Sequence, residues 1–338
     1  MSIEELSGEE RSRYARHLML PEVGMAGQER LKAASVLCVG AGGLGSPLLL
    51  YLAAAGVGRI GIVDGDVVEL SNLQRQVIHG MDWLGQSKGR SAAHRLQELN
   101  PHCQVELHEQ MLDRENALEL IARYDLVCDG SDNFPTRYLV NDACVLQGKP
   151  LIYGSVQRFD GQASVFNRTP ESPNYRDLLP EPPPMEQVPS CAEAGVMGVM
   201  PGLIGLIQAT EAIKLITGIG RSLDGRLLVV DALTMGFREL ALRRHPERPA
   251  IDGSIDYQQF CRPTASSRDS IGVIELKSLR DGSADDLVLL DVRNPAEAEV
   301  AVIPGAVLIP LATIKSGEAI DRIRGLAESG RVYVHCKL

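Results

Sequence analysis

Residues 35–45 read S-V-L-C-V-G-A-G-G-L-G, and this stretch decides the fold of the chain. The apolar run at its start ends at Gly40, and a segment rich in leucine and alanine follows as far as Ala55. Glycines crowded between two apolar segments are typical of a tight turn that joins a buried strand to a helix. We therefore expect a strand, a glycine turn and a helix, in this order.

The glycines of this turn indicate phosphate binding. Gly40 permits the tight turn, Gly42 lets the backbone approach an anion, and Gly45 lets the helix pack closely against the strand. The amino end of the helix offers unpaired N–H groups to negatively charged oxygens. We take these three glycines and Gly43 as candidate cofactor-binding positions; a turn needed only for packing is the alternative.

An acidic residue stands at the distance from the turn at which a ribose is bound. Asp64 follows the apolar run I-G-I-V and lies nineteen residues beyond Gly45, where an acid can hydrogen-bond a ribose hydroxyl. A lysine-bearing phosphate loop is disfavoured, because Ser46 and Leu48 stand where its lysine would follow. The turn and Asp64 together predict a nucleotide site.

Composition predicts a soluble globular protein. The chain has 338 residues, of which 44% are hydrophobic and 23% charged, so it can bury one large core and carry a second module. Its net charge of −10 argues against general affinity for nucleic acid. The apolar segments 47–57 and 195–207 are too short and too rich in glycine to span a bilayer. The acidic amino terminus is unlike a signal peptide, and we expect a cytoplasmic protein with no membrane partner.

The order of elements predicts an α/β fold. Strands and helices alternate from the glycine turn to the strand that ends at Asp129, which is typical of a Rossmann-like, mostly parallel sheet with helices on both faces. Short strands after Leu151 predict antiparallel pairing at the sheet edge. We expect residues 1–244 to form the nucleotide-binding domain, 245–270 a linker, and 271–338 a second α/β module that is cut short. Within the first domain, residues 169–189 are rich in proline and are expected to be a long loop.

Charged residues near the turn favour triphosphate chemistry over hydride transfer. Arg75 in L-S-N-L-Q-R-Q and Lys88 in G-Q-S-K could neutralise phosphates, and Asp132 in G-S-D-N could hold Mg²⁺ through oxygen. Each of them alone could be an ordinary surface ion pair. Their common place at the ends of successive strands favours a site.

Five motifs carry a family resemblance: G-A-G-G-L-G, D-x-D-x-V-x-x-S-N-L-Q-R-Q, G-x-S-K, D-G-S-D-N and P-S-C-A-E-A-G-V. They closely resemble the MoeB/ThiF/HesA family of ubiquitin-activating-type adenylyltransferases over residues 7–245. The resemblance implies ATP-dependent adenylation of the C-terminal glycine carboxylate of a ubiquitin-like sulfur-carrier protein, as in molybdopterin, thiamin or cysteine biosynthesis.

The resemblance also implies roles for single residues. By match to the family motifs, Asp64 holds the ribose, Arg75 and Lys88 the phosphates, and Asp132 the magnesium, and we place Asp66 and Asn72 with the cofactor-binding residues. In R-Y-A-R-H, Arg16 matches the arginine that reaches the triphosphate of the neighbouring subunit. This match implies a homodimer.

The chain departs from the family pattern where many relatives bind zinc. Seven cysteines are scattered without any C-x-x-C pair, and Asn174 and Asp177 stand at the first of the two expected pairs. The segment R-H-P-E-R-P-A lacks the second pair. We therefore predict no zinc site.

The second module is similar to a rhodanese domain. L-L-D-V-R-N-P-A-E, I-P-G-A-V-L-I-P and V-Y-V-H-C-K carry this resemblance from Ile271 onward, and the whole chain resembles the fused MoeZ-type adenylyltransferase/sulfurtransferases. Cys336 matches the persulfide cysteine, although the loop and arginine that would surround it are absent from the sequence. In the long loop, Cys191 matches the position of an acyl-persulfide or disulfide link to the carrier.

Two other classes of function remain open from the sequence. An NAD-dependent oxidoreductase would share the glycine turn and Asp64, but gives Arg75, Lys88 and Asp132 no joint role. A non-catalytic protein that only docks sulfur carriers is the second alternative, and the shortened rhodanese-like module is the feature in its favour.

Overall fold

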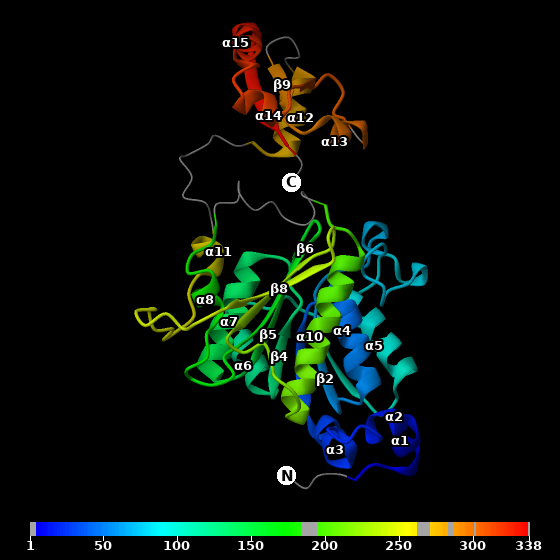
Figure 1. The fold of residues 1–338 in the computed structure, drawn as a ribbon. Coiled ribbons are helices and arrows are strands. Elements are labelled where there is room, and N and C mark those ends of the chain that lie inside the picture. Colours follow the sequence, from blue (N-terminus) through cyan, green and yellow to red (C-terminus); the bar gives the residue numbers. More distant parts are fainter. Residues whose placement is uncertain (1–4, 184–194, 262–270, 283–286, 301, 337–338) are drawn as a thin grey trace. The chain divides into compact units, whose positions relative to one another are not determined.

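The computed structural model describes residues 5–183, 195–261, 271–282, 287–300 and 302–336 (Figure 1). The chain folds as two compact units, residues 1–263 and 264–338. Each unit has a sheet of its own, mixed in the first and parallel in the second.

The first unit is built on a mixed sheet of eight strands. Their order across the sheet is β3 (Gln104–His108), β2 (Arg59–Val63), β1 (Ser35–Val39), β4 (Leu126–Asp129), β5 (Leu151–Gln157), β6 (Asp160–Phe166), β7 (Arg226–Asp231) and β8 (Gly236–Ala241). The first five are parallel, and β6, β7 and β8 add antiparallel pairs at one edge. This arrangement confirms the fold class expected from the sequence.

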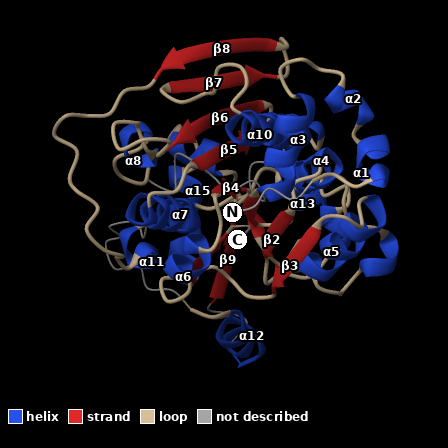
Figure 2. Ribbon diagram, turned by 90° about the horizontal axis from the view of Figure 1, so that it is seen from below, coloured by secondary structure: helices blue, strands red, loops and turns tan. Residues whose placement is uncertain are grey.

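Helices cover both faces of this sheet (Figure 2). One face carries α3 (Gly24–Ala33), α4 (Gly45–Ala55), α5 (Lys88–Leu99) and α10 (Val199–Thr217), and the other carries α6 (Ala117–Ala122) and α7 (Phe134–Gln147). Each face has its own apolar core. Successive residues of β1 are buried in both cores, which explains why the strand reads as an unbroken apolar run.

The amino-terminal helical segment is divided into two short helices at Tyr14. Ser7 caps α1 (Gly8–Arg13), accepting the N–H of Glu10, whose carboxylate accepts the N–H of Ser7 in return. This helix ends at Arg13, and α2 (Ala15–Leu18) follows after Tyr14. Tyr14 is buried at this corner and its hydroxyl accepts a hydrogen bond from Asn100 at 2.8 Å.

The proline-rich stretch 169–189 is not wholly a loop. A short helix, α8 (Tyr175–Leu178), lies within it because Asn174 caps the helix and Asp177 completes a capping box. The side chain of Tyr175 is buried against Tyr138 of α7, with ring centroids 5.0 Å apart. Local capping and one aromatic anchor therefore overcome the extended preference of the surrounding prolines.

Part of the expected linker packs on the first unit. In residues 245–261, α11 (Tyr257–Phe260) contacts α7, and the ring of Phe260 meets Tyr138 edge-on at 5.1 Å. Tyr257 is buried in the same core. The boundary between the compact units falls at residue 263, within the expected linker.

From its sequence, the apolar segment 195–207 is expected to be too short to span a bilayer. The helix α10 continues to Thr217, and by length and composition alone it could cross a membrane. In the structure it packs against α4, β5 and β6. Its Glu211 is buried and accepts the N–H of Leu223 at 2.7 Å, and Gln208 donates to the carbonyl of Asp129 at 2.7 Å. These contacts are typical of the core helix of a globular domain.

The second unit has a small parallel sheet in the order β10 (Val307–Leu308), β9 (Leu287–Asp291) and β11 (Arg331–His335). Its described helices are α12 (Val273–Gly282), α13 (Pro295–Val300), α14 (Leu311–Lys315) and α15 (Ile320–Ser329). Leu290, Ile309 and Ala319 form its buried core. At the end of β9, the buried carboxylate of Asp291 pairs with Arg293 at 2.7 Å.

Candidate nucleotide site

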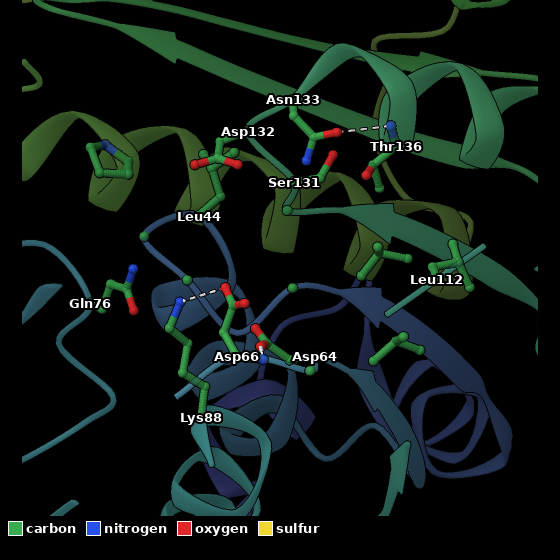
Figure 3. Close-up of a pocket in the computed structure, with 18 of the residues that line it drawn as sticks. Leu44, Asp64, Asp66, Gln76, Lys88, Leu112, Ser131, Asp132, Asn133 and Thr136 are labelled. Atoms are coloured by element: carbon green, nitrogen blue, oxygen red, sulfur yellow. Dashed lines mark hydrogen bonds and ion pairs between the residues drawn. The ribbon is translucent and has the colours of Figure 1, made fainter. Parts of the chain in front are cut away.

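A pocket opens at the carboxyl ends of β1, β2 and β4 (Figure 3). In the strand order 3-2-1-4, chain connections run to opposite sides of β1, and ligands of such sheets bind where this reversal occurs. The residues that line the pocket include Gly40, Gly42, Gly43, Asp64, Asp66, Arg75, Gln76, Lys88, Asp132, Asn133, Thr136 and Arg137. Most of the residues selected from the sequence therefore meet in one place.

The glycine turn has the shape that its sequence suggests. Gly40 has φ +93°, a conformation that residues with a side chain rarely adopt. A Cβ on Gly45 would lie 2.1 Å from the carbonyl oxygen of Gly40, so this residue allows α4 to pack against the end of β1 and does not itself line the pocket. Among the described residues, the N–H groups of Gly42 and Gly43 donate to no protein acceptor. They are free to bind an anion.

Asp64 links the turn to the end of β2. Its buried carboxylate accepts the N–H of Ala41 at 2.8 Å and the N–H of Asp66 at 2.9 Å. Burial raises the pKa of Asp64, while the two backbone hydrogen bonds and the charge of Lys88 oppose this rise. Each oxygen keeps a lone pair for a further donor, as a ribose hydroxyl would provide.

Lys88 stands at the start of α5, on the pocket wall opposite Asp132 in Figure 3. Ser87 caps this helix by accepting the N–H of Arg90 at 3.2 Å. The ammonium group of Lys88 donates to Asp66 at 3.0 Å, and the backbone N–H of Lys88 donates to the carbonyl of Asp66. The side chain of Lys88 is 10% exposed whereas that of Asp66 is 60% exposed. The cation is therefore held in place by a partner that solvent can still reach.

Arg75 and Asp132 bring charges that no described protein group neutralises. The guanidinium of Arg75 donates to the carbonyl of Ser71 at 3.0 Å and forms no ion pair within the described residues. The carboxylate of Asp132 is exposed in the pocket and has no hydrogen-bond partner in the same part of the chain. Beside it, Asn133 caps α7 by accepting the N–H of Thr136 at 3.0 Å.

Two buried polar residues of the pocket were not selected from the sequence. Gln76 is 5% exposed, and its Oε1 lacks a partner among the described residues. Arg137 is 7% exposed; its Nη2 donates to the carbonyl of Ser131 at 3.3 Å, while its Nε is unpaired within the described ranges. The one sequence feature that points to Gln76 as a site residue is its place directly after Arg75 in L-S-N-L-Q-R-Q.

Besides Gly45, four selected residues are not found in the pocket lining. Asn72 is outside the pocket lining, because its carboxamide oxygen accepts the N–H of Glu69 at 3.1 Å and caps η1 (Leu70–Asn72). Arg16 lies on α2, exposed to solvent. Cys336 is exposed after β11 in the second unit, and Cys191 falls outside the described residues.

The fold and this pocket define a Rossmann-type nucleotide-binding protein with cations and a free carboxylate around the phosphate turn. The ThiF family model matches residues 14–250, and the chain belongs to the ThiF family. This result confirms the resemblance seen in the motifs.

Individual relatives agree with this assignment. The chain is 52% identical to the probable adenylyltransferase/sulfurtransferase MoeZ of Mycobacterium tuberculosis over 98% of its own length and 86% of that protein. It is 53% identical to the sulfur carrier protein adenylyltransferase of Thermus thermophilus, over 75% of this chain and 97% of the relative. The crystal structure of E. coli MccB with ATP shares the fold, with a TM-score of 0.63 at 20% identity over 70% of this chain and 73% of MccB.

Proposed function

We propose that this protein uses ATP to adenylate the C-terminal glycine carboxylate of a ubiquitin-like sulfur-carrier protein, as a cytoplasmic step in molybdopterin, thiamin or cysteine biosynthesis. The observation that carries this proposal is the meeting of the glycine turn, Asp64, Arg75, Lys88 and Asp132 in one pocket. A relative that matches nearly all of this chain is named a probable adenylyltransferase/sulfurtransferase, and this name supports the proposal.

In this reaction, the carrier carboxylate is itself the nucleophile. Its oxygen attacks the α-phosphorus of ATP, the bond from this phosphorus to the α,β-bridging oxygen breaks, and pyrophosphate leaves while the acyl adenylate forms. The N–H groups of Gly42 and Gly43 and the cations of Arg75 and Lys88 bind the phosphates and offset the charge on the leaving pyrophosphate. The protein contributes positioning and charge, and no protein nucleophile is required.

Magnesium fits the donor set of the pocket. Asp132 offers an unpaired carboxylate, among the described residues, close to the phosphate turn, and oxygen ligands are those that Mg²⁺ prefers. When bound, the ion would neutralise phosphate charge. Exchange of radiolabelled pyrophosphate into ATP tests the proposal: we expect exchange that depends on both Mg²⁺ and the carrier, and exchange that is absent with every candidate carrier would contradict it.

The position of Arg16 favours a homodimer. Figure 1 groups α1, α2 and α3 at one end of the first unit, and α3 ends just before β1 begins. Arg16 therefore lies at the amino ends of the strands, whereas the pocket lies at their carboxyl ends. An arginine in this place can contact the triphosphate only when it comes from a second copy of the chain.

A sulfur-transfer step would use two cysteines, Cys336 and Cys191. Cys336 is exposed at the carboxyl end of a parallel strand, a position suited to a persulfide in a rhodanese-like unit. Cys191 lies outside the described residues. We predict that Cys191→Ala leaves pyrophosphate exchange intact and impairs thiocarboxylate formation, measured from the mass of the carrier; a folded variant that loses exchange would refute this role.

Polar contacts join the two segments where the family pattern places the zinc-binding cysteine pairs. Asp177 accepts the N–H groups of Asn174 and His245, both at 2.8 Å, and forms an ion pair with Arg248. These contacts tie α8 to the segment after β8. They support a fold that needs no zinc at this place, and we predict that protein dialysed against a weak chelator retains less than stoichiometric zinc.

A further inference from the structure

We propose that His79, carrying its proton on Nε2, is a positioning residue that aims the backbone of the glycine turn at the nucleotide. His79 follows the motif L-S-N-L-Q-R-Q and is absent from the pocket lining. The inference rests on the proposed function only in that the turn binds the phosphates of a nucleotide.

The imidazole of His79 is held on both sides. Nε2 lies 2.9 Å from the carbonyl oxygen of Ala41, and Nδ1 lies 2.9 Å from Oγ of Ser91 on α5. A carbonyl can only accept, so Nε2 must donate. Nδ1 then accepts from the Ser91 hydroxyl, and both ring nitrogens are satisfied in the neutral ring. His79, Ala41 and Ser91 are all buried.

The contact with Ala41 sets the direction of a neighbouring N–H group. A trans peptide is planar, so its C=O and N–H point in opposite directions. The carbonyl of Ala41 and the N–H of Gly42 belong to the same peptide unit. When His79 holds the carbonyl of Ala41, the N–H of Gly42 is turned away from His79. Of the two residues Ala41 and Gly42, only Gly42 lines the pocket, together with Lys88.

The preceding peptide unit is fixed from the other side. The N–H of Ala41 donates to Asp64 at 2.8 Å. Asp64 and His79 therefore hold two successive peptide units between Gly40 and Gly42, at a place where glycine leaves the backbone unusually free. Without His79, no donor orients the peptide unit between Ala41 and Gly42. The carbonyl of Ala41 then becomes a buried acceptor without a partner.

The surroundings of His79 favour the neutral ring. Burial lowers the pKa of His79, and the positive charge of Lys88 lowers it further, while the hydrogen bond to Ala41 opposes both. A neutral ring has one donor only, which fixes the tautomer. Through Ser91, this tautomer also ties the turn to α5, the helix that carries Lys88.

The test compares His79→Ala, His79→Gln and the exposed control His94→Gln, using calorimetric titration with Mg²⁺ and α,β-methylene ATP. We expect His79→Ala to weaken binding by about 10- to 100-fold, as for a buried acceptor left unpaired. Gln can donate from Nε2 and should recover binding to within about 3-fold of wild type. In pyrophosphate exchange, the loss in His79→Ala should lie in KM for ATP rather than in kcat.

Two results would overturn the inference. One is a folded His79→Ala variant that binds the analogue as tightly as wild type, and the other is a Gln variant as weak as the Ala variant. If His79→Ala does not fold, long-range ¹⁵N spectra of the wild-type histidines decide: a protonated Nε2 and unprotonated Nδ1 support the inference, and the reverse refutes it. Titration and spectra need no carrier, so a failure of adenylation would leave them unaffected.

Discussion

Lys88→Met tests whether a partly exposed ion pair serves the nucleotide rather than the fold. The side chain of Lys88 packs along the pocket wall, and methionine keeps most of that apolar stem while removing the charge. Its partner Asp66 is 60% exposed and stays hydrated when the ammonium is gone. We therefore expect the substitution to lower kcat/KM for ATP strongly and to lower Tm only slightly.

The two magnitudes can be estimated separately. An ion pair with one solvated partner contributes about 0–1 kcal/mol, which lowers Tm by no more than about 4 °C in a unit of this size. A charge-assisted contact to a phosphate is worth about 1.5–3 kcal/mol. Its loss should reduce kcat/KM for ATP by roughly 10- to 150-fold.

A matched control lies at the other end of the sheet. Lys32 on α3 pairs with Glu10 at 3.0 Å, but here the carboxylate is the buried partner, with its side chain 6% exposed. Lys32→Met should destabilise the fold by about 1–3 kcal/mol and lower Tm by roughly 3–10 °C. Its kcat/KM for ATP should match wild type.

Pyrophosphate exchange at varied ATP and calorimetric unfolding of both variants provide the assay. The reasoning is refuted when Lys88→Met keeps wild-type kcat/KM, or when it loses activity only in proportion to unfolded protein. It is also refuted when the two variants show the same pattern of effects.

The remaining predictions concern the metal, the turn and its packing. Asp132→Ala should abolish Mg²⁺-dependent exchange with little change in Tm, because its carboxylate has no described protein partner; exchange at the wild-type rate would remove it from the site. Gly45→Ala should lower Tm by roughly 4–10 °C, since its Cβ would meet Gly40 at 2.1 Å, whereas Gly202→Ala in α10 meets nothing within 4 Å and should not destabilise. Equal Tm values for the two alanine variants would contradict this account of the turn.

The parts of the site that could be predicted from the sequence depend on spacing along the chain. Gly40, Gly42 and Asp64 follow from the strand–turn–helix pattern, and parallel strands bring their carboxyl ends together whatever the details of packing. The position of Lys88 can be predicted in the same way, because α5 begins at Lys88, at the carboxyl ends of the strands.

The parts that could not be predicted depend on the direction of single side chains. Gln76 and His79 belong to a polar loop, and nothing in their spacing distinguishes them from less buried neighbours such as Gln74. Asn72 was selected for the nucleotide, but its carboxamide caps η1. A side chain that hydrogen-bonds to nearby backbone is not available to the nucleotide, and the sequence pattern does not reveal such a bond.

Long-range packing explains the differences in the fold. Proline content predicts a loop over residues 169–189, but Tyr175 anchors the short helix α8 against α7. Phe260 of α11 likewise packs on α7 and draws part of the polar segment 245–261 onto the first unit. A single aromatic side chain can fix such a segment, and composition does not show where it will pack.

The most direct test of the central claim is the mass of the carrier after incubation with this protein, ATP and Mg²⁺. With each candidate ubiquitin-like sulfur carrier in turn, the account predicts an AMP adduct at the C-terminal glycine of at least one carrier, lost when that glycine is removed. Binding of ATP by the folded protein with no adduct on any carrier, under conditions that preserve acyl adenylates, would contradict the account.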